Sequence, residues 1–197
     1  MDRFPNTRQP DWDWWGRLWP TPGATLRRLG ISFDASLVEI GCGNGYFALP
    51  AARITDPAPV YALDLDETLL DELTDIADRE AIHNVVPIHG DARDLTEHLP
   101  TPVDTALIAN TFHGVDDVAG LVREVVAALE PGGRFIVVNW VARPRASTTV
   151  AGEARGPPME RRLSAGATET AVFDAADCRV SRRLDLPPYH YALVFER

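Results

Sequence analysis

The chain contains no lysine, so all 19 of its basic residues are arginines, and they stand against 29 aspartates and glutamates. The resulting net charge of −10 makes the chain a poor partner for a phosphate backbone, and we expect no nucleic-acid substrate. An acidic chain without lysine is found in proteins from salt-loving organisms and in proteins encoded by GC-rich genomes. The sequence alone leaves both explanations open.

Cysteine is also scarce, because Cys42 and Cys178 are the only two, and two cysteines cannot build a disulfide framework. No spacing of cysteine and histidine resembles a metal site, so we predict no metal. The sequence has no run of 18 apolar residues that could cross a membrane, and its polar first residues lack the apolar part of a signal peptide. These absences predict a cytoplasmic protein with no membrane partner.

The composition that remains is typical of a folded domain, with 45% hydrophobic residues in a chain of 197. From about residue 36 to 140 strand and helix patterns alternate, which predicts an α/β fold with a parallel sheet. Helices are expected at 21–30, 116–129 and 164–176, and two closing strands at 178–186 and 189–196. We expect one domain over 1–197, comprising an aromatic amino-terminal arm or lid (1–35), a cofactor-binding core (36–140), a substrate loop (141–163), and a helix with the closing strands (164–197).

The segment VEIGCGNGYF at 38–47 is the most informative part of the chain. An apolar strand runs into a Gly-x-Gly-x-Gly turn before a helix, and such a turn lets a ligand lie against the backbone. The dinucleotide fingerprint would require glycine at position 46, where this chain has Tyr46. A cofactor that contains adenosine but is not a dinucleotide therefore fits better, although a purely structural turn is the alternative.

Three further strands end in polar residues. Asp64 follows the strand at 60–63 and is placed to accept ribose hydroxyls, whereas Asp66 immediately precedes a helical pattern and is expected to cap it. Asp91 follows the next strand and can accept from the amine of adenine, and Asn110 follows the strand at 106–109. At 129–138 a helix is expected to stop at Pro-Gly-Gly, and a hydrophobic strand is expected to begin there.

This order of motifs, from about 36 to 138, resembles the class I S-adenosylmethionine-dependent methyltransferases. The resemblance implies a Rossmann-like sheet of seven strands, parallel except for an antiparallel last strand, with helices on both faces. It implies S-adenosylmethionine as cofactor, with the glycines and Glu39 near its methionine part, Asp64 on the ribose, and Leu65, Asp91 and Ala92 around the adenine. The full implied cofactor set is Glu39, Gly41, Cys42, Gly43, Asn44, Gly45, Asp64, Leu65, Asp91, Ala92 and Asn110.

The chain looks most like the small-molecule branch of this family. Nucleic-acid adenine methyltransferases carry Asn/Asp-Pro-Pro-Tyr after the fourth strand, whereas this chain has Asn110-Thr111-Phe112-His113. We therefore predict in-line methyl transfer to a small molecule. Two alternatives are a protein that binds S-adenosylmethionine without catalysis and, with less support, a nicotinamide-dependent oxidoreductase. The acceptor atom and the oligomeric state lie beyond the sequence.

Candidates for the acceptor side come from three segments and from His113. His113 follows the fourth strand, and its neutral imidazole can accept a proton near pH 7. Four tryptophans between residues 12 and 19 either cover one face of the sheet or form a lid over the cofactor, and the arginines of 141–163 either face water or hold an anionic group. The catalytic candidates are His113, Tyr189 and His190, and the substrate candidates are Trp14, Trp15, Arg155, Arg161 and Tyr191.

Overall fold

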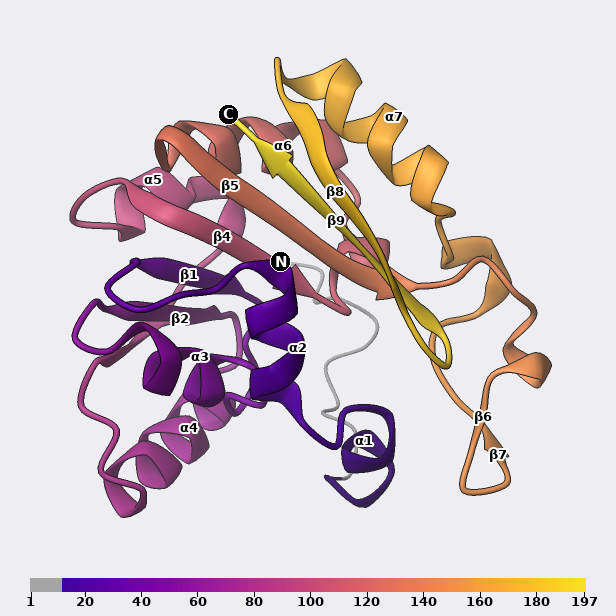
Figure 1. Cartoon of the computed structure of the whole chain (residues 1–197), viewed down its shortest axis with the longest axis horizontal. Coiled ribbons are helices and arrows are strands. Elements are labelled where there is room, and N and C mark those ends of the chain that lie inside the picture. The colour runs from indigo at the N-terminus through magenta and orange to yellow at the C-terminus, as the bar shows by residue number, and fades with distance from the viewer. Residues whose placement is uncertain (1–11) are drawn as a thin grey trace.

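The computed structural model describes residues 12–197, and for residues 12 and 13 it describes the backbone only. The first part of the expected arm, residues 1–11, lies outside the described residues. Within the described part, seven strands form one sheet (Figure 1). In spatial order they are β3 (Val85–His89), β2 (Val60–Asp64), β1 (Leu37–Ile40), β4 (Val103–Ala109), β5 (Leu129–Trp140), β9 (His190–Glu196) and β8 (Arg179–Leu186).

The directions of the strands confirm the predicted fold. Strands β1 to β5 pair in parallel, whereas β9 runs antiparallel to both of its neighbours, β5 and β8. The order of the strands reverses at β1, where β2 lies on one side and β4 on the other. In open α/β sheets, ligands bind beyond the carboxyl ends of the strands near such a point.

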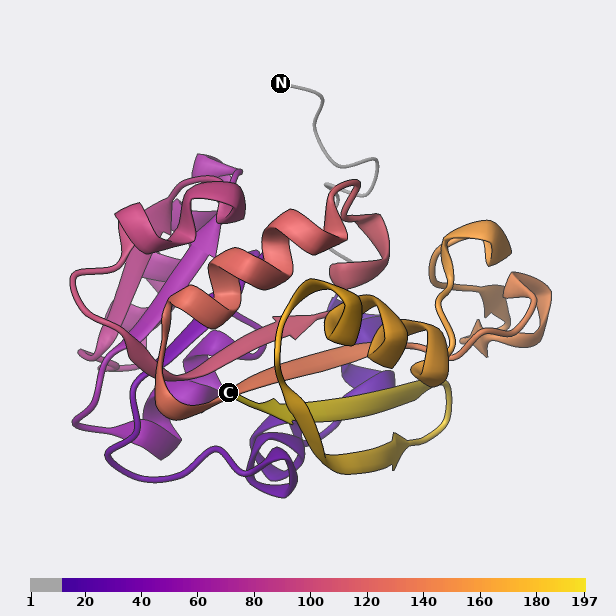
Figure 2. The same cartoon turned by 90° about the horizontal axis from the view of Figure 1, so that it is seen from above.

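Helices cover both faces of the sheet, as Figure 2 shows from above. One hydrophobic cluster packs the first four helices against one face, and a second cluster packs the last three against the other. Successive residues of β5 serve the two clusters in turn, because side chains alternate along a strand: Phe135 belongs to the second cluster and Ile136 to the first. The helices are α1 (Trp12–Leu18), α2 (Pro22–Leu29), α3 (Ala48–Thr55), α4 (Glu67–Arg79), α5 (Leu95–His98), α6 (Val118–Ala127) and α7 (Ala165–Ala175).

The Pro-Gly-Gly segment does not separate a helix from a strand, so that prediction was wrong. Helix α6 ends at Ala127, and β5 already begins at Leu129, which pairs with Val103. The register then shifts before Arg134 pairs with Thr105, and Gly132 takes a φ of +79° inside this irregularity. The glycines therefore allow a bulge within the strand, a position that glycine's freedom at positive φ suits.

The segment 141–163 contains several short elements. It holds the 3-10 turns η3 (Arg145–Ser147) and η4 (Met159–Arg161) and a small hairpin of β6 (Thr149–Val150) and β7 (Glu153–Ala154). Figure 1 shows this segment leaving the end of β5 and reaching toward α1, and α1 contacts β6. Two segments that are far apart in sequence therefore meet beside the same end of the sheet.

Among residues 12–197, no helix has the length and hydrophobicity needed to cross a membrane.

Candidate active site

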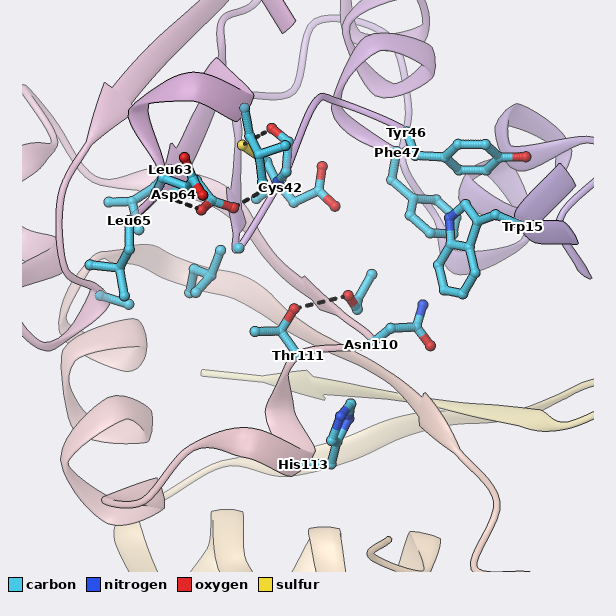
Figure 3. A pocket seen from close by; sticks show the side chains of 18 of the residues that line it. Trp15, Cys42, Tyr46, Phe47, Leu63, Asp64, Leu65, Asn110, Thr111 and His113 are labelled. Carbon is cyan, nitrogen blue, oxygen red and sulfur yellow. Dashed lines mark hydrogen bonds between the residues drawn. The ribbon is translucent and has the colours of Figure 1, made fainter. Parts of the chain in front are cut away.

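A cavity of about 320 Å³ lies at the carboxyl ends of the parallel strands (Figure 3). The last residues of β1, β2, β4 and β5 line it, together with the residues that follow β3. This is the edge at which the predicted strand-end motifs were expected to converge. Most of the predicted cofactor residues do meet there: Glu39, Gly41, Cys42, Gly43, Asp64, Leu65, Asp91, Ala92 and Asn110 line the cavity.

The glycine turn after β1 is held tightly from both sides. Gly41 has a φ of +70°, and a Cβ atom built on it would lie 2.9 Å from the side chain of Thr111. Gly45 has a φ of +91°, but a Cβ there would meet Leu49 rather than the cavity. Asn44 also points elsewhere, since its amide donates to Glu72 on α4 over 3.1 Å. Gly45 and Asn44 therefore shape the turn from behind, and the structure does not place them on the cavity wall.

Asp64 ties this turn to the second strand. Its Oδ2 accepts the backbone N–H of Gly43 over 2.7 Å, and its Oδ1 accepts the N–H of Asp66 over 3.0 Å. Figure 3 shows its carboxylate beside the glycine turn. Asp66 caps α4, because its side chain accepts the N–H of Thr68, and this confirms the role expected for it.

Glu39 is a carboxylate enclosed by the protein at the floor of the cavity. It is 2% exposed, and its Oε2 has no hydrogen-bond partner among the described residues. Burial raises the pKa of Glu39 well above its ordinary value of 4.5, and the nearby Asp64 raises it further. An unpaired buried carboxyl oxygen is costly, so this floor is built to receive a donor, and a positively charged donor suits it best.

We expect Glu39→Gln to stabilise the ligand-free protein by about 1 kcal/mol, which corresponds to about 2–4 °C in Tm. The substitution replaces an acid whose ionisation is opposed by burial and by Asp64 with a neutral amide. Because the pKa of Glu39 is raised in the folded state, the folded wild type keeps a proton that the unfolded chain loses above about pH 4.5, so the wild type loses stability as the pH rises from there. Thermal unfolding of both proteins between pH 5 and pH 8 should therefore show a gap that widens with pH. A variant less stable than the wild type at every pH would contradict this reading.

The far end of the cavity carries Asp91, Ala92 and Leu65. Asp91 caps the 3-10 turn η1 (Ala92–Asp94) by accepting the N–H of Arg93, and it also pairs with the exposed guanidinium of Arg93. This guanidinium lowers the pKa of Asp91, so the carboxylate is charged at neutral pH. Leu65 follows β2 and points toward the same end (Figure 3).

Asn110 stands at the end of β4 in a strained backbone conformation. Its φ is +60°, which residues other than glycine rarely adopt, and neither atom of its side-chain amide has a partner within residues 12–197. Figure 3 shows this amide in the cavity between Thr111 and Trp15. A strained residue with unpaired polar atoms in a cavity is typical of a ligand site.

His113 belongs to the 3-10 turn η2 (Phe112–Gly114) and lines the cavity, with its ring directed toward Asn110 (Figure 3). Its Nδ1 lies 3.2 Å from Oδ1 of Asn139, an atom that also accepts the backbone N–H of Trp140 over 3.0 Å. Since a backbone N–H can only donate, that atom of Asn139 is an oxygen, and Nδ1 of His113 must carry a proton. In the neutral ring Nε2 is then the nitrogen with a free lone pair.

The environment keeps the imidazole of His113 neutral. Burial lowers its pKa from the ordinary value of 6.5, the bond to Asn139 raises it in part, and Arg161 and Arg162 lower it again by repulsion. At neutral pH the ring is therefore able to accept a proton at Nε2.

One wall of the cavity is aromatic and cationic. Trp14 and Trp15 of α1 line the cavity, and their rings meet edge to face. Trp15 also packs against Tyr46, which follows the glycine turn. From the 141–163 segment comes Arg155, whose guanidinium carbon lies 4.8 Å from the centre of the Trp14 ring. Three of the predicted substrate residues, Trp14, Trp15 and Arg155, thus line the cavity, and their role there stays a prediction.

Four of the predicted catalytic and substrate residues are not among those that line the cavity. His190 is 3% exposed and packed between Trp19 and Trp140, and this burial lowers its pKa to about 3. Tyr191 faces the other side of β9, where its hydroxyl bonds Thr168 and the carbonyl of Leu163. The remaining two are Tyr189, which donates to the carbonyl of Thr149, and Arg161, which is exposed on η4.

The cavity residues that were not singled out from the sequence as site residues include Trp140, Arg145 and Thr111. Trp140 ends β5 at the same edge as the other strand ends, so the rule that selected Asn110 could have found it. Arg145 was noted only as one of the loop arginines. Thr111 reaches the cavity by packing against Gly41, a contact between residues 70 positions apart that no local pattern reveals.

Comparisons with known proteins identify a family with this architecture. Residues 38–137, which are 100 of 197, match a family model described as a methyltransferase domain. A tRNA (guanine-N(7)-)-methyltransferase from Mycobacterium leprae is 32% identical over 45% of this chain and 44% of its own length. A demethylmenaquinone methyltransferase from Listeria welshimeri is 25% identical over 58% of this chain and 49% of its own length. The chain thus spans less than half the length of these curated relatives.

The crystal structure of a SAM-dependent methyltransferase from Aquifex aeolicus has the same fold. It superposes with a TM-score of 0.78, is 20% identical, and covers 92% of both chains. The family model covers half of the chain and includes the glycine turn, Asp64, Asp91 and Asn110. The chain therefore belongs to the methyltransferase domain family.

Proposed function

We propose that this chain transfers a methyl group from S-adenosylmethionine to a small-molecule acceptor. The cavity's polar atoms fit the methionine part of that cofactor, because Glu39 offers an unpaired buried carboxyl oxygen to its ammonium group. The unpaired amide of Asn110 offers both a donor and an acceptor nearby. These two orphaned groups are the structural reason for assigning the cofactor to this cavity.

We assign the rest of the cofactor along the cavity in the direction of β3. The carboxylate of Asp64 would accept the ribose hydroxyls while keeping its bonds to the glycine turn, since a carboxylate has about four acceptor positions. Asp91 and the backbone of Ala92 would read the adenine edge, and Leu65 would pack on its face. Family membership favours this cofactor over the nicotinamide alternative.

Two segments that lie over the cavity support a small acceptor. This observation is the main support for proposing a small-molecule substrate. Helix α1 and the 141–163 segment both contribute lining residues, and they meet where Arg155 lies over Trp14. We propose that these two segments are the lid and the substrate loop of a single domain. A polynucleotide would have to displace them, and the charge of −10 opposes its approach. The relatives' names include both tRNA and menaquinone chemistry, so the acceptor class needs a direct test.

Bound S-adenosylmethionine supplies a sulfonium methyl group that is already activated for transfer. The protein's own residues then have three tasks. The lid residues exclude water, and the aromatic wall orients the acceptor for in-line attack; such positioning can contribute about 7–11 kcal/mol. Nε2 of His113 takes the proton of an acceptor that must lose one, while Asn139 holds the ring through Nδ1.

The test is transfer of a labelled methyl group. The protein is incubated with methyl-labelled S-adenosylmethionine and, separately, with a small-metabolite extract and with total tRNA. We expect label in a small molecule and none in tRNA. Label in tRNA alone would overturn the acceptor class, and no label in either would favour a protein that binds the cofactor without using it. Calorimetry with S-adenosylmethionine and NAD tests the cofactor separately, and we expect binding of the first alone.

A further inference from the structure

Arg155 is held in place by its backbone. Its N–H donates to the carbonyl of Thr148 over 2.8 Å, and its own carbonyl accepts from the hydroxyl of Thr148 and from Nη2 of Arg162, over 2.8 and 3.0 Å. None of these bonds uses the side chain of Arg155. Its guanidinium is therefore presented to the cavity from a fixed point, and it can be replaced without breaking the support beneath it.

The guanidinium of Arg155 is only partly satisfied. Its Nη2 forms an ion pair with Glu153 over 2.7 Å, but the Glu153 side chain is 70% exposed. Ion pairs that face water in this way contribute little to stability. Its Nε is buried and has no hydrogen-bond partner among the residues described. The plane of Trp14 lies against the same guanidinium. A buried N–H donor with no acceptor, on a cation that lines a cavity, calls for an anionic or strongly polar ligand atom.

A second arginine and the local charge also indicate an anionic ligand beside Arg155. Arg145 lines the cavity as well. The segment 141–163 carries five arginines and two glutamates, a local charge of +3 in a chain whose total is −10. Glu39, Asp64 and Asp91 line other parts of the same cavity. The cavity is thus acidic where the cationic cofactor is assigned and basic where the acceptor is assigned.

The walls between these charges are flat and aromatic. Trp14 and Trp140 both line the cavity, and the guanidinium carbon of Arg162 lies 5.2 Å from the centre of the Trp140 ring. His113 lines the same region and offers a proton acceptor. A planar body with a negative group at one edge and a weakly acidic O–H or N–H elsewhere would use all of these features.

We propose that the methyl acceptor is an aromatic carboxylate whose carboxyl group is held by Arg155 with help from Arg145; this rests on the proposed function. The methyl group passes from the sulfonium to a hydroxyl oxygen on the ring, or to a ring nitrogen, of the acceptor, whose proton goes to His113, and the cofactor leaves as the neutral thioether. The carboxylate of the cofactor's own methionine part has the same chemistry, so the test must tell these two sources apart.

The test compares two probes of nearly equal shape, 4-hydroxybenzoate and 4-hydroxybenzamide. Each is titrated calorimetrically into wild type and Arg155→Gln that are saturated with S-adenosylhomocysteine. We expect the carboxylate to bind wild type at least about tenfold more tightly than the amide, and Arg155→Gln to lose most of this preference. Arg155→Lys should keep a part of it, because it keeps the charge but not the planar donor edge.

Arg143→Gln is the matched control, since Arg143 is exposed in the same segment and does not line the cavity. It makes the same change of charge and should bind both probes as wild type does. The proposal is overturned if wild type binds both probes equally or neither at up to about 10 mM, or if Arg143→Gln loses as much as Arg155→Gln. It is also overturned if Arg155→Gln weakens S-adenosylhomocysteine alone, which would assign Arg155 to the cofactor. Failure of wild type to bind S-adenosylhomocysteine would instead refute the proposed function itself.

Discussion

Asp64→Ala is expected to weaken S-adenosylmethionine binding about a hundredfold, or about 2.7 kcal/mol. Two losses combine in this variant. The ribose loses its charged acceptor, and the glycine turn loses the bond from the N–H of Gly43 that holds it against β2. Isothermal calorimetry with S-adenosylmethionine and with its demethylated product measures the change, and both ligands should be weakened alike because they share the ribose.

Asp66→Ser is the matched control for Asp64→Ala. Asp66 is two residues away and also lines the cavity, but its side chain caps α4. Serine is an equally good capping residue, so this variant removes a carboxylate and keeps the helix start. Cofactor affinity within about threefold of wild type is expected for it, since a change of that size is below 1 kcal/mol. Equal losses in the two variants would show that the general charge of the rim, rather than Asp64, holds the cofactor.

His113→Asn should lower the rate of labelled methyl transfer about a hundredfold while leaving cofactor affinity within about twofold of wild type. The variant cannot accept the proton, yet it lies outside the assigned cofactor positions. The active form is the neutral ring, and its pKa is lowered below 6.5. The wild-type rate should therefore be flat at pH 7 and above, and it should fall as the pH drops through this lowered pKa. We call this fall at low pH the acid limb of the pH–rate profile, and it should be absent in His113→Asn.

Asn139→Ala tests the positioning of the same ring. Because the bond from Asn139 raises the pKa of His113, its loss should move the acid limb to lower pH and also lower the plateau rate. A residue of purely structural importance would lower the rate without moving the limb. Equal losses of rate and cofactor affinity in His113→Asn would reduce His113 to a structural role.

The cavity residues that we assign to the cofactor were predictable because each is defined by a short stretch of chain. A polar residue at or just after the end of an apolar strand must lie at the strand's carboxyl end, and parallel strands bring those ends to one edge. Asp64, Asp91 and Asn110 follow this rule, and all three line the cavity. The separate role of Asp66 could be read in the same way, from the helix that begins immediately after it.

The acceptor side was less predictable because it depends on which way side chains turn in the folded chain. His190 begins β9 opposite Trp140, close to the rim, but its ring turns inward between two tryptophans. Arg155 and Arg161 occur in the same segment, and only the fold of the hairpin decides that Arg155 reaches the cavity. Position along the chain carries no signal for such choices, which are set by packing across long separations.

The amino-terminal helix belongs to the hydrophobic interior as much as to the cavity. Trp15, Leu18 and Trp19 are at most 8% exposed, and they share one cluster with residues of α3 and with Ala192 of β9. Helix α3 lies within the stretch that matches the family model, residues 38–137, but α1 and Ala192 lie outside it. A fragment excised at those bounds would leave apolar surface bare on both sides and would aggregate. Shortened versions for crystallography or protein engineering should therefore keep residues 12–197 together.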